Sequence, residues 1–344
     1  MKRLLNTLYV TTPGAALYRE GDTVKVRASG ATRLQVPLHG LESIVCFGQP
    51  GVSSPLLDLC TKQGVPIAFL TESGRFLARI QGPQSGNVFL RREQYRRAGL
   101  PAPAAAVTRG VVGAKVANAR AVLLRAGRDR PGQDGHHVLK DAAARLVGIL
   151  DRVRTSGAVD TLRGLEGEAA RVYFSVFDHL ITRDKEHFFF RERNRRPPLD
   201  NMNALLSFLY TLLTHDMVSA LEGVGLDPAV GFLHRDRPGR PGLALDLIEE
   251  FRPFLADRLA LSLVNRQQVQ SGGFRRQETG AILMDGDTRK TVLVAYQKRK
   301  QEEILHPFLG EKIAIGLIPH VQSLLLARHL RDDLEAYPPF FWKG

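Results

Sequence analysis

The spacing of apolar residues divides the chain into two parts with different periods. Over the first eighty residues, short runs rich in β-branched and aromatic residues are separated by Gly, Pro and Asp, which is typical of strands. The predicted strands are Thr7–Val10, Thr23–Arg27, Arg33–Leu38, Ser43–Phe47, Ile67–Leu70 and Phe76–Ile80. One helix interrupts them, because Ser53 and Pro55 are typical of a helix start and Gly64 of a helix end.

From about residue 101 the period becomes helical, in long segments rich in Ala, Leu and Arg. The predicted helices cover residues 104–127, 137–154, 158–182, 202–223, 243–252 and 318–336. The run Thr291–Tyr296 fits either a strand or the start of a helix. We therefore predict an α+β multidomain fold. A β-strand-rich N-terminal domain (1–85) is followed by a linker with a basic helix (86–101) and a larger all-α-helical C-terminal domain (102–344).

The chain is strongly basic, with a formal net charge of +13 over 344 residues. An excess of arginine on both domains favours a polyanion partner, nucleic acid before membrane, although an arginine-rich genome would give the same composition. Cys46 and Cys60 are too few for a disulfide framework or a zinc site. No signal-peptide pattern and no run of about eighteen apolar residues is present. We expect a soluble, cytoplasmic protein that does not enter a membrane.

Glu166 lies on the apolar face of the predicted helix 158–182. It follows Leu162 by four residues and precedes Tyr173 by seven, so its side chain projects along the buried stripe. A carboxylate in that position is costly unless it is paired or bound to a metal. The residues alone leave two interpretations open, an ion pair with an arginine of a neighbouring helix and a metal ligand.

His234 and two carboxylates form a second group of candidates. His234 lies in a loop, Gly231–Gly242, which is fixed by Pro and Gly, just before a predicted helix that carries Asp246 and Glu249. These acids are three residues apart and share a face, where they repel each other unless a cation lies between them. Hard cations such as Mg²⁺ or Mn²⁺ fit this donor set. The alternatives are a structural histidine and an ordinary exposed Asp-x-x-Glu pair.

Arginines gather in the segment Arg191–Asn203 and in the histidine loop. Guanidinium groups there are suited to DNA phosphates and carry no base specificity, and a solvated basic loop is the alternative. The predicted DNA-binding residues are Arg193, Arg195, Arg196, Arg235, Arg237 and Arg240. The chain has neither a Gly-x-x-x-x-Gly-Lys-Ser/Thr phosphate loop nor a Gly-x-Ser-x-Gly elbow, which gives little support to nucleotide-dependent or hydrolase-triad chemistry.

Taken together, the motifs resemble those of a known family, the CRISPR-associated spacer-acquisition integrases and endonucleases (CRISPR-associated protein one). The matching runs are Leu162–Phe174, Arg195–Asp200 with Asn203–Ser207, Gly231–His234 and Asp246–Pro253. The tail Tyr337–Phe340 is similar to that of the subtype I-C branch. The resemblance covers nearly the whole chain, with order and spacing kept.

The resemblance implies a β domain for dimerisation and a helical catalytic domain. It implies that Glu166, His234 and Glu249 are the catalytic metal ligands, with Asp246 an auxiliary carboxylate. Many relatives have aspartate at the third ligand position. The expected cofactor is Mg²⁺ or Mn²⁺.

The family resemblance also implies a reaction and partners. The expected reaction is metal-dependent strand transfer of a captured DNA fragment into the leader end of a CRISPR array, with cleavage of single-stranded, double-stranded and branched DNA. The expected partners are prespacer DNA, the leader-repeat, a second copy of the chain and the small ferredoxin-like CRISPR-associated protein two. The rival hypothesis is a non-catalytic basic scaffold that binds nucleic acid.

Overall fold

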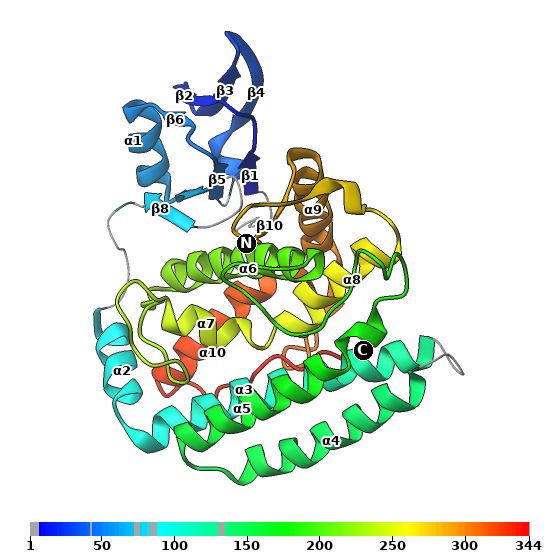
Figure 1. Cartoon of the computed structure of the whole chain (residues 1–344). Helices are drawn as coiled ribbons and strands as arrows, with labels where there is room; N and C mark the ends of the chain where they lie inside the picture. The colour runs from blue at the N-terminus through cyan, green and yellow to red at the C-terminus, as the bar shows by residue number, and fades with distance from the viewer. Residues whose placement is uncertain are drawn as a thin grey trace. The chain divides into compact units, whose positions relative to one another are not determined.

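The computed structural model describes residues 7–41, 43–71, 76–80, 82, 88–129 and 135–343 (Figure 1). Contacts divide the chain into two compact units. The first unit comprises Met1–Ser85, Met284–Glu303 and Ala314–Leu317, and the second comprises Gly86–Leu283, Ile304–Ile313 and Ile318–Gly344. The predicted α+β class is confirmed, since strands dominate the N-terminal part and helices the C-terminal part. Within the predicted linker (86–101), residues 86 and 87 lie outside the described residues.

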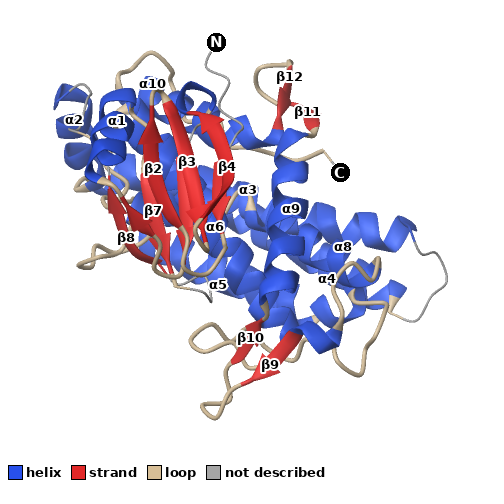
Figure 2. Ribbon diagram, turned by 90° about the horizontal axis from the view of Figure 1, so that it is seen from above, coloured by secondary structure: helices blue, strands red, loops and turns tan. Residues whose placement is uncertain are grey.

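Two four-stranded sheets make up the strand-rich part of the first unit (Figure 2). One has the order β1 (Thr7–Val10), β5 (Ser43–Phe47), β7 (Ile67–Leu70) and β8 (Phe76–Ile80). The other has the order β4 (Ala31–Pro37), β3 (Thr23–Ala28), β2 (Ala16–Glu20) and β6 (Gly51–Val52). The first three strands of the former run parallel and β8 is antiparallel. All six predicted strands are confirmed, while β2 and β6 are additional.

Both sheets share one core with helix α1 (Ser54–Gln63), which confirms the predicted helix. Leu17 and Ile44, from different sheets, are fully buried with Leu56 of α1. The two cysteines are free buried thiols. Burial raises the pKa of Cys46 to about 12, so it stays protonated.

A helix also belongs to the first unit, α9 (Gly286–Gln301), followed by the short 3₁₀ turn η5 (Ile315–Leu317). Asp285 caps α9 by accepting from the Thr288 N–H at 2.8 Å. The ambiguous run Thr291–Tyr296 is therefore helical. The strand alternative is wrong because the capped start places this run inside a sixteen-residue helix.

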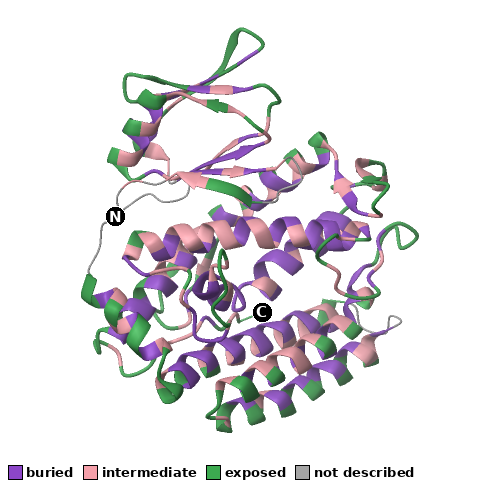
Figure 3. Cartoon of the chain, turned by 60° about the vertical axis from the view of Figure 1, so that its left-hand side comes forward, coloured by how far each residue is buried: buried purple, intermediate pink, exposed green. Residues whose placement is uncertain are grey.

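The second unit is mainly helical, and buried residues line the inward faces of its long helices (Figure 3). Its helices are α2 (Val88–Ala98), α3 (Pro101–Asp129), α4 (His136–Thr155), α5 (Val159–Ser175), η2 (Phe177–Leu180), α6 (Asn201–Val224), α7 (Gly242–Ile248), η3 (Arg252–Asp257), α8 (Arg258–Asn265), η4 (Ser271–Gly273) and α10 (Ile318–Leu330). Short strand pairs are β9 (Phe274–Arg276) with β10 (Ile282–Met284) and β11 (Glu303–Leu305) with β12 (Lys312–Ala314). Helix α3 packs against both α4 and α5.

Helix α6 is long and apolar enough, by length and composition, to cross a membrane, and 56% of that window is buried inside the protein. Leu205, Leu209 and Leu213 are fully buried, and the helix packs against α7 and α10. Asp200 caps its start by accepting from the Asn203 N–H at 2.7 Å. α6 is thus a core helix of the second unit.

The predicted helix 243–252 is shorter and continues differently. α7 ends at Ile248, and the chain then forms a π-helical turn, η3, that leads directly into α8. Pro253 lies in the first turn of η3, where a missing N–H costs least, so the helical path resumes after the proline rather than stopping. The Arg258 N–H reaches back five residues to the Pro253 carbonyl. The predicted helix 158–182 likewise ends early, at Ser175.

Candidate active site

Glu166 and Glu249 meet at a lysine. The Lys115 ammonium of α3 contacts the Glu166 carboxylate of α5 and lies 2.6 Å from Glu249 Oε2. The exposed fraction of the side chain is 11% for Lys115 and 3% for Glu249, so this ion pair is shielded from water. Of the two interpretations left open for Glu166, the ion pair is present, but its cation is a lysine and not an arginine.

The charges in this cluster keep one another ionised. Burial favours the neutral form of Glu249, but the nearby Arg252 and Lys115 outweigh it and hold the pKa of this carboxyl well below its usual range. Burial would likewise lower the pKa of Lys115, yet Glu249 and Glu166 raise it. Both carboxylate and ammonium are therefore charged at neutral pH.

Arg252 is the second cation of the cluster. Its Nη1 donates to Glu249 Oε1 at 2.5 Å, and its guanidinium stacks 4.8 Å from the centre of the Tyr210 ring. Tyr210 in turn donates to Asp257 Oδ1 at 2.6 Å. Arg252 and Asp257 are the two ends of η3, so the π-helical turn brings both onto the same tyrosine.

Asp246 fixes His234. The buried Asp246 carboxylate accepts from the backbone N–H groups of Phe232, Leu233 and His234 at 2.6–2.9 Å, and from His234 Nδ1 at 2.6 Å. A carboxylate only accepts, so Nδ1 carries the proton and Nε2 keeps a free lone pair. Gly231 is needed here, since a Cβ would come within 2.7 Å of Asp246 Oδ2.

The histidine loop is also tied to the helix that carries Glu166. Arg163, one turn before Glu166 on α5, donates to the Leu233 carbonyl from Nη2 at 2.7 Å and from Nε at 3.1 Å. His234 lies near enough to Glu249 for the two side chains to interact electrostatically. Two anchors, Asp246 and Arg163, therefore hold the imidazole within electrostatic reach of Glu249.

The donor chemistry of this site suits a hard divalent cation, but its geometry is that of a lysine-filled cluster. Two carboxylates and an imidazole with a free Nε2 are ligands that Mg²⁺ and Mn²⁺ accept. Glu249 Oε2 is buried without a hydrogen bond of normal geometry and faces only the Lys115 ammonium. Among the described residues, no three His, Cys, Asp or Glu side chains are grouped as a metal site.

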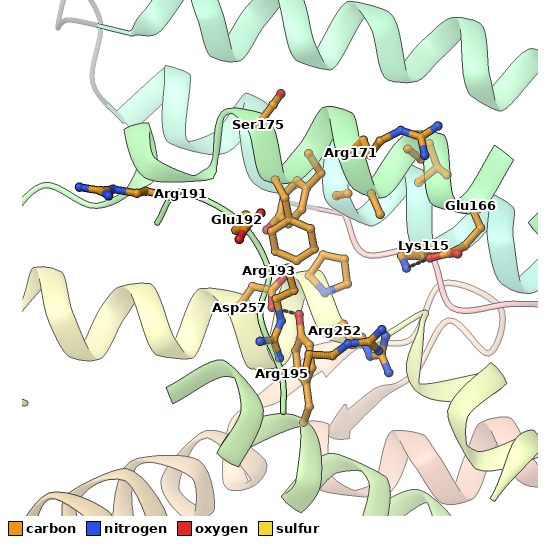
Figure 4. A pocket seen from close by; sticks show the side chains of 18 residues that line it. Lys115, Glu166, Arg171, Ser175, Arg191, Glu192, Arg193, Arg195, Arg252 and Asp257 are labelled. Carbon is orange, nitrogen blue, oxygen red and sulfur yellow. Dashed lines mark hydrogen bonds and ion pairs between the residues drawn. The ribbon is translucent and has the colours of Figure 1, made fainter. Parts of the chain in front are cut away.

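A cavity of about 590 Å³ opens beside this cluster (Figure 4). Lys115 and Glu166 face each other at one side of it, while Arg193, Arg195 and Arg252 lie at another. Several aromatic rings complete the wall, contributed by Tyr173, Phe174 and Tyr210. A cavity with cationic and aromatic walls is suited to a nucleotide segment with its phosphate.

Not all six predicted DNA-binding arginines have the same environment. Arg193 is half-buried, its guanidinium donating to Asn203 Oδ1 at 2.6 Å and to Ser207 Oγ at 3.1 Å, so it also holds the start of α6. Arg235 is exposed and lies 3.2 Å from Asp160.

The other four arginines come from two loops that meet. Burial lowers the pKa of Arg240, and the nearby charges of Arg237, Arg195 and Arg196 lower it further. Arg195, Arg196 and Arg237 therefore all lie within electrostatic reach of Arg240. Such a concentration of like charge is stabilised by an anionic ligand.

Lys115 and Arg252 were not among the predicted site residues. A signal for Lys115 exists, since it follows Val111 by four residues and precedes Ala119 by four on the buried stripe of α3. The argument that singled out Glu166 applies equally to a lysine in this position. Arg252 has no such signal, because its partners come from the fold of η3.

Comparisons with known proteins agree with this fold. A family model described as CRISPR associated protein Cas1 matches residues 8–298. The Chlorobaculum tepidum protein named CRISPR-associated endonuclease Cas1 1 is 53% identical over 343 residues, covering 100% of both chains. A solved Cas1 protein from Thermotoga maritima has a TM-score of 0.81 at 23% identity, covering 95% of this chain and 97% of its own. A casposase bound to an integration product has a TM-score of 0.83 at 21% identity, covering 97% and 93%. These two structures show the shared fold.

Proposed function

The chain belongs to the CRISPR-associated Cas1 family, and on this premise we propose that it is a metal-dependent DNA integrase. It inserts captured DNA fragments as new spacers at the leader end of a CRISPR array. Its curated relatives are named endonucleases, and the chain is an enzyme of that nuclease and integrase class. The observation that supports the proposal most is the pairing of Glu166 with the buried Glu249 across Lys115, near an anchored imidazole and an arginine-lined cavity.

Glu166, His234 and Glu249 would hold Mg²⁺ or Mn²⁺ in this proposal. Their chemistry supports it, since two carboxylate groups and one free imidazole nitrogen leave room for substrate oxygens around the ion. Asp246 would be an auxiliary carboxylate, which fixes the His234 tautomer. Glu249 reaches further than an aspartate would, because it carries one more methylene.

The reaction is a direct transesterification. The 3′-hydroxyl of the captured DNA attacks a phosphodiester of the repeat, and one P–O bond forms as another breaks, so no nucleotide cofactor is consumed. When bound, the divalent cation polarises the phosphoryl oxygen and favours the alkoxide form of the attacking hydroxyl. Arg252 and the cavity arginines stabilise the charge that develops on phosphorus oxygens. With water as nucleophile, the same site cleaves single-stranded, double-stranded and branched DNA.

Arginines outside the metal site hold the DNA backbone. We propose that Arg195, Arg196, Arg237 and Arg240 contact phosphates, with Arg193 and Arg235 at the edges of the same surface. From family membership we further propose that the chain dimerises through its strand-rich part and assembles with the small ferredoxin-like partner of the family. We also propose that it acts in the cytoplasm, away from membranes, and that it belongs to the subtype I-C branch.

The rival is a basic scaffold whose carboxylates are only structural ion pairs. Glu166→Gln and His234→Ala separate the two, with Glu168→Gln as the control, since Glu168 lies on the same helix but pairs with Arg152 at the surface. We expect strand transfer into a supercoiled array plasmid to be lost in both site variants and kept in the control. DNA affinity should stay within a few-fold in all three. Strand transfer that persists in both site variants would rule out this metal site.

A further inference from the structure

The buried cluster around Glu249 is already neutral without a metal ion. Two carboxylates, Glu166 and Glu249, face two cations, Lys115 and Arg252. The nearby Asp246 carboxylate is occupied by three backbone N–H groups and His234. The charge that a divalent cation would need from its ligands is therefore neutralised by the protein's own side chains.

We propose that Lys115 makes divalent-cation binding at this site dependent on DNA. A dication that enters a neutral, shielded cluster adds two uncompensated charges, and it is repelled by the ammonium at close range. The DNA phosphate supplies negative charge to the same place. This inference rests on the proposed function, because it concerns the same ligands.

The geometry gives Lys115 an alternative partner. Lys115 lines the wall of the 590 Å³ cavity in which a phosphate would lie, and a lysine ammonium sits on a flexible four-carbon stem. In the metal-free protein the ammonium holds Glu166 and Glu249 together. With DNA and cation bound, it leaves Glu249 to the ion and contacts a phosphate oxygen, so the site opens to the metal only when the substrate arrives.

Because of thermodynamic linkage, this exchange can be measured as the ratio of the cation affinities with and without DNA. If DNA raises the affinity for the cation, the cation must raise the affinity for DNA by the same factor, typically about 5–150-fold for coupled sites. Lys115 is a positioning residue in this scheme, acting on the two glutamates. Without it, the carboxylates carry excess negative charge, so the cation should bind well before DNA does.

The test is a Mn²⁺ titration of the full-length chain, followed by electron paramagnetic resonance, with and without a short DNA duplex that has 3′ overhangs. In the wild-type chain, DNA should raise Mn²⁺ affinity at least about 5-fold. In Lys115→Met, Mn²⁺ should bind at least about 10-fold more tightly without DNA, and the ratio should fall toward one. Lys140→Met removes an exposed lysine on α4 and should change neither value.

Two further arms separate the possible failures. Glu166→Gln should remove the DNA-dependent Mn²⁺ signal, and it also corrects for Mn²⁺ bound by the DNA alone. If Glu166→Gln keeps the DNA-dependent Mn²⁺ signal, the proposed metal site is wrong. If Glu166→Gln removes the signal, but Lys115→Met binds Mn²⁺ no more tightly than wild type, the proposed role of Lys115 is wrong. If Lys115→Met does not fold, Lys115→Gln replaces it, since it keeps a hydrogen-bond donor at this position. Equal Mn²⁺ affinity of the wild-type chain with and without DNA would also overturn the inference.

Discussion

Glu249 and Glu250 are neighbours in the chain and are both buried, yet their surroundings differ completely. Glu249 faces two cations, Arg252 at 2.5 Å and Lys115 at 2.6 Å. Glu250 faces neutral donors instead, accepting from the Tyr337 hydroxyl and the Phe340 N–H at 2.8 Å. Burial raises the pKa of Glu250 to about 7 because these hydrogen bonds offset it only in part, whereas the pKa of Glu249 is lowered.

The difference shows that the charge of the partners, and not burial itself, decides the ionisation of a buried carboxyl group here. It also assigns separate tasks to two sides of one short segment. The Glu249 side stays charged and forms the candidate metal site. The Glu250 side fastens the C-terminal tail, together with Asn118, which donates to the carbonyls of Glu250 and Phe340 and accepts from the Trp342 N–H. The tail thus stabilises the segment that carries Glu249 through its contacts with Glu250 and Asn118.

The largest expected effect comes from Arg252→Met, which removes a cation from the charged side. Glu249 would remain buried with only Lys115 as its cationic partner, so the free energy of unfolding should fall by about 3–5 kcal/mol. Urea denaturation measures this, with Arg154→Met as control because Arg154 is largely exposed and pairs with Asp151 within α4. The control should lose less than about 1 kcal/mol. Equal losses of unfolding free energy in Arg252→Met and Arg154→Met would show that Glu249 does not depend on its cationic partners.

Next in size is the pH dependence of the neutral side. The pKa of Glu250 is about 7 in the folded state against an ordinary value of 4.5, so the unfolded chain releases its proton first. The free energy of unfolding therefore decreases as pH rises from 4.5 to 7, and Glu250→Gln should remove this loss.

Relative to wild type, Glu250→Gln should gain up to about 3 kcal/mol between pH 4.5 and pH 8. Urea denaturation at a series of pH values checks this, with the surface variant Glu168→Gln as control. The carboxyl of Glu249 would act in the opposite sense, since its lowered pKa adds stability that is lost as pH falls below 4.5. A flat difference between wild type and Glu250→Gln would show that Glu250 is ionised in the folded protein.

The smallest effect is expected for Tyr337→Phe, which removes the hydroxyl that donates to Glu250 and accepts from Gln322. The aromatic ring stays, so the free energy of unfolding should fall by about 1–2 kcal/mol, the cost of hydrogen bonds lost in a buried site. Tyr18→Phe, on an exposed face of β2, should have no measurable effect. Thermal and urea unfolding should rank the stability losses of these two variants in the same order. A loss as large as that of Arg252→Met would make the tail, rather than the cations, the main support of the segment.

Local patterns in the sequence accounted for much of this molecule. The strand runs and the inward position of Glu166 both follow from spacing and turn residues over a few positions. Lys115 was within reach of the same argument, although the sequence says nothing about which carboxylates it contacts.

What stayed hidden depends on distant parts of the chain. The contact of Glu250 with Tyr337 joins residues 87 apart, so no local period reveals it. The extra width of η3 is invisible for a different reason. A π-helical turn has the same apolar composition as an α-helical one, and only its hydrogen-bond register differs.

That wide turn limits how this stretch of the chain can diverge. In an α-helix, residues five apart point about 140° from each other, yet here Arg252 and Asp257 reach one tyrosine. Deleting a single residue from the turn would rotate everything after it and separate Asp257 from Tyr210, while Glu249 stayed in place. Length, more than residue type, is what natural variation must conserve between the metal-site glutamate and α8.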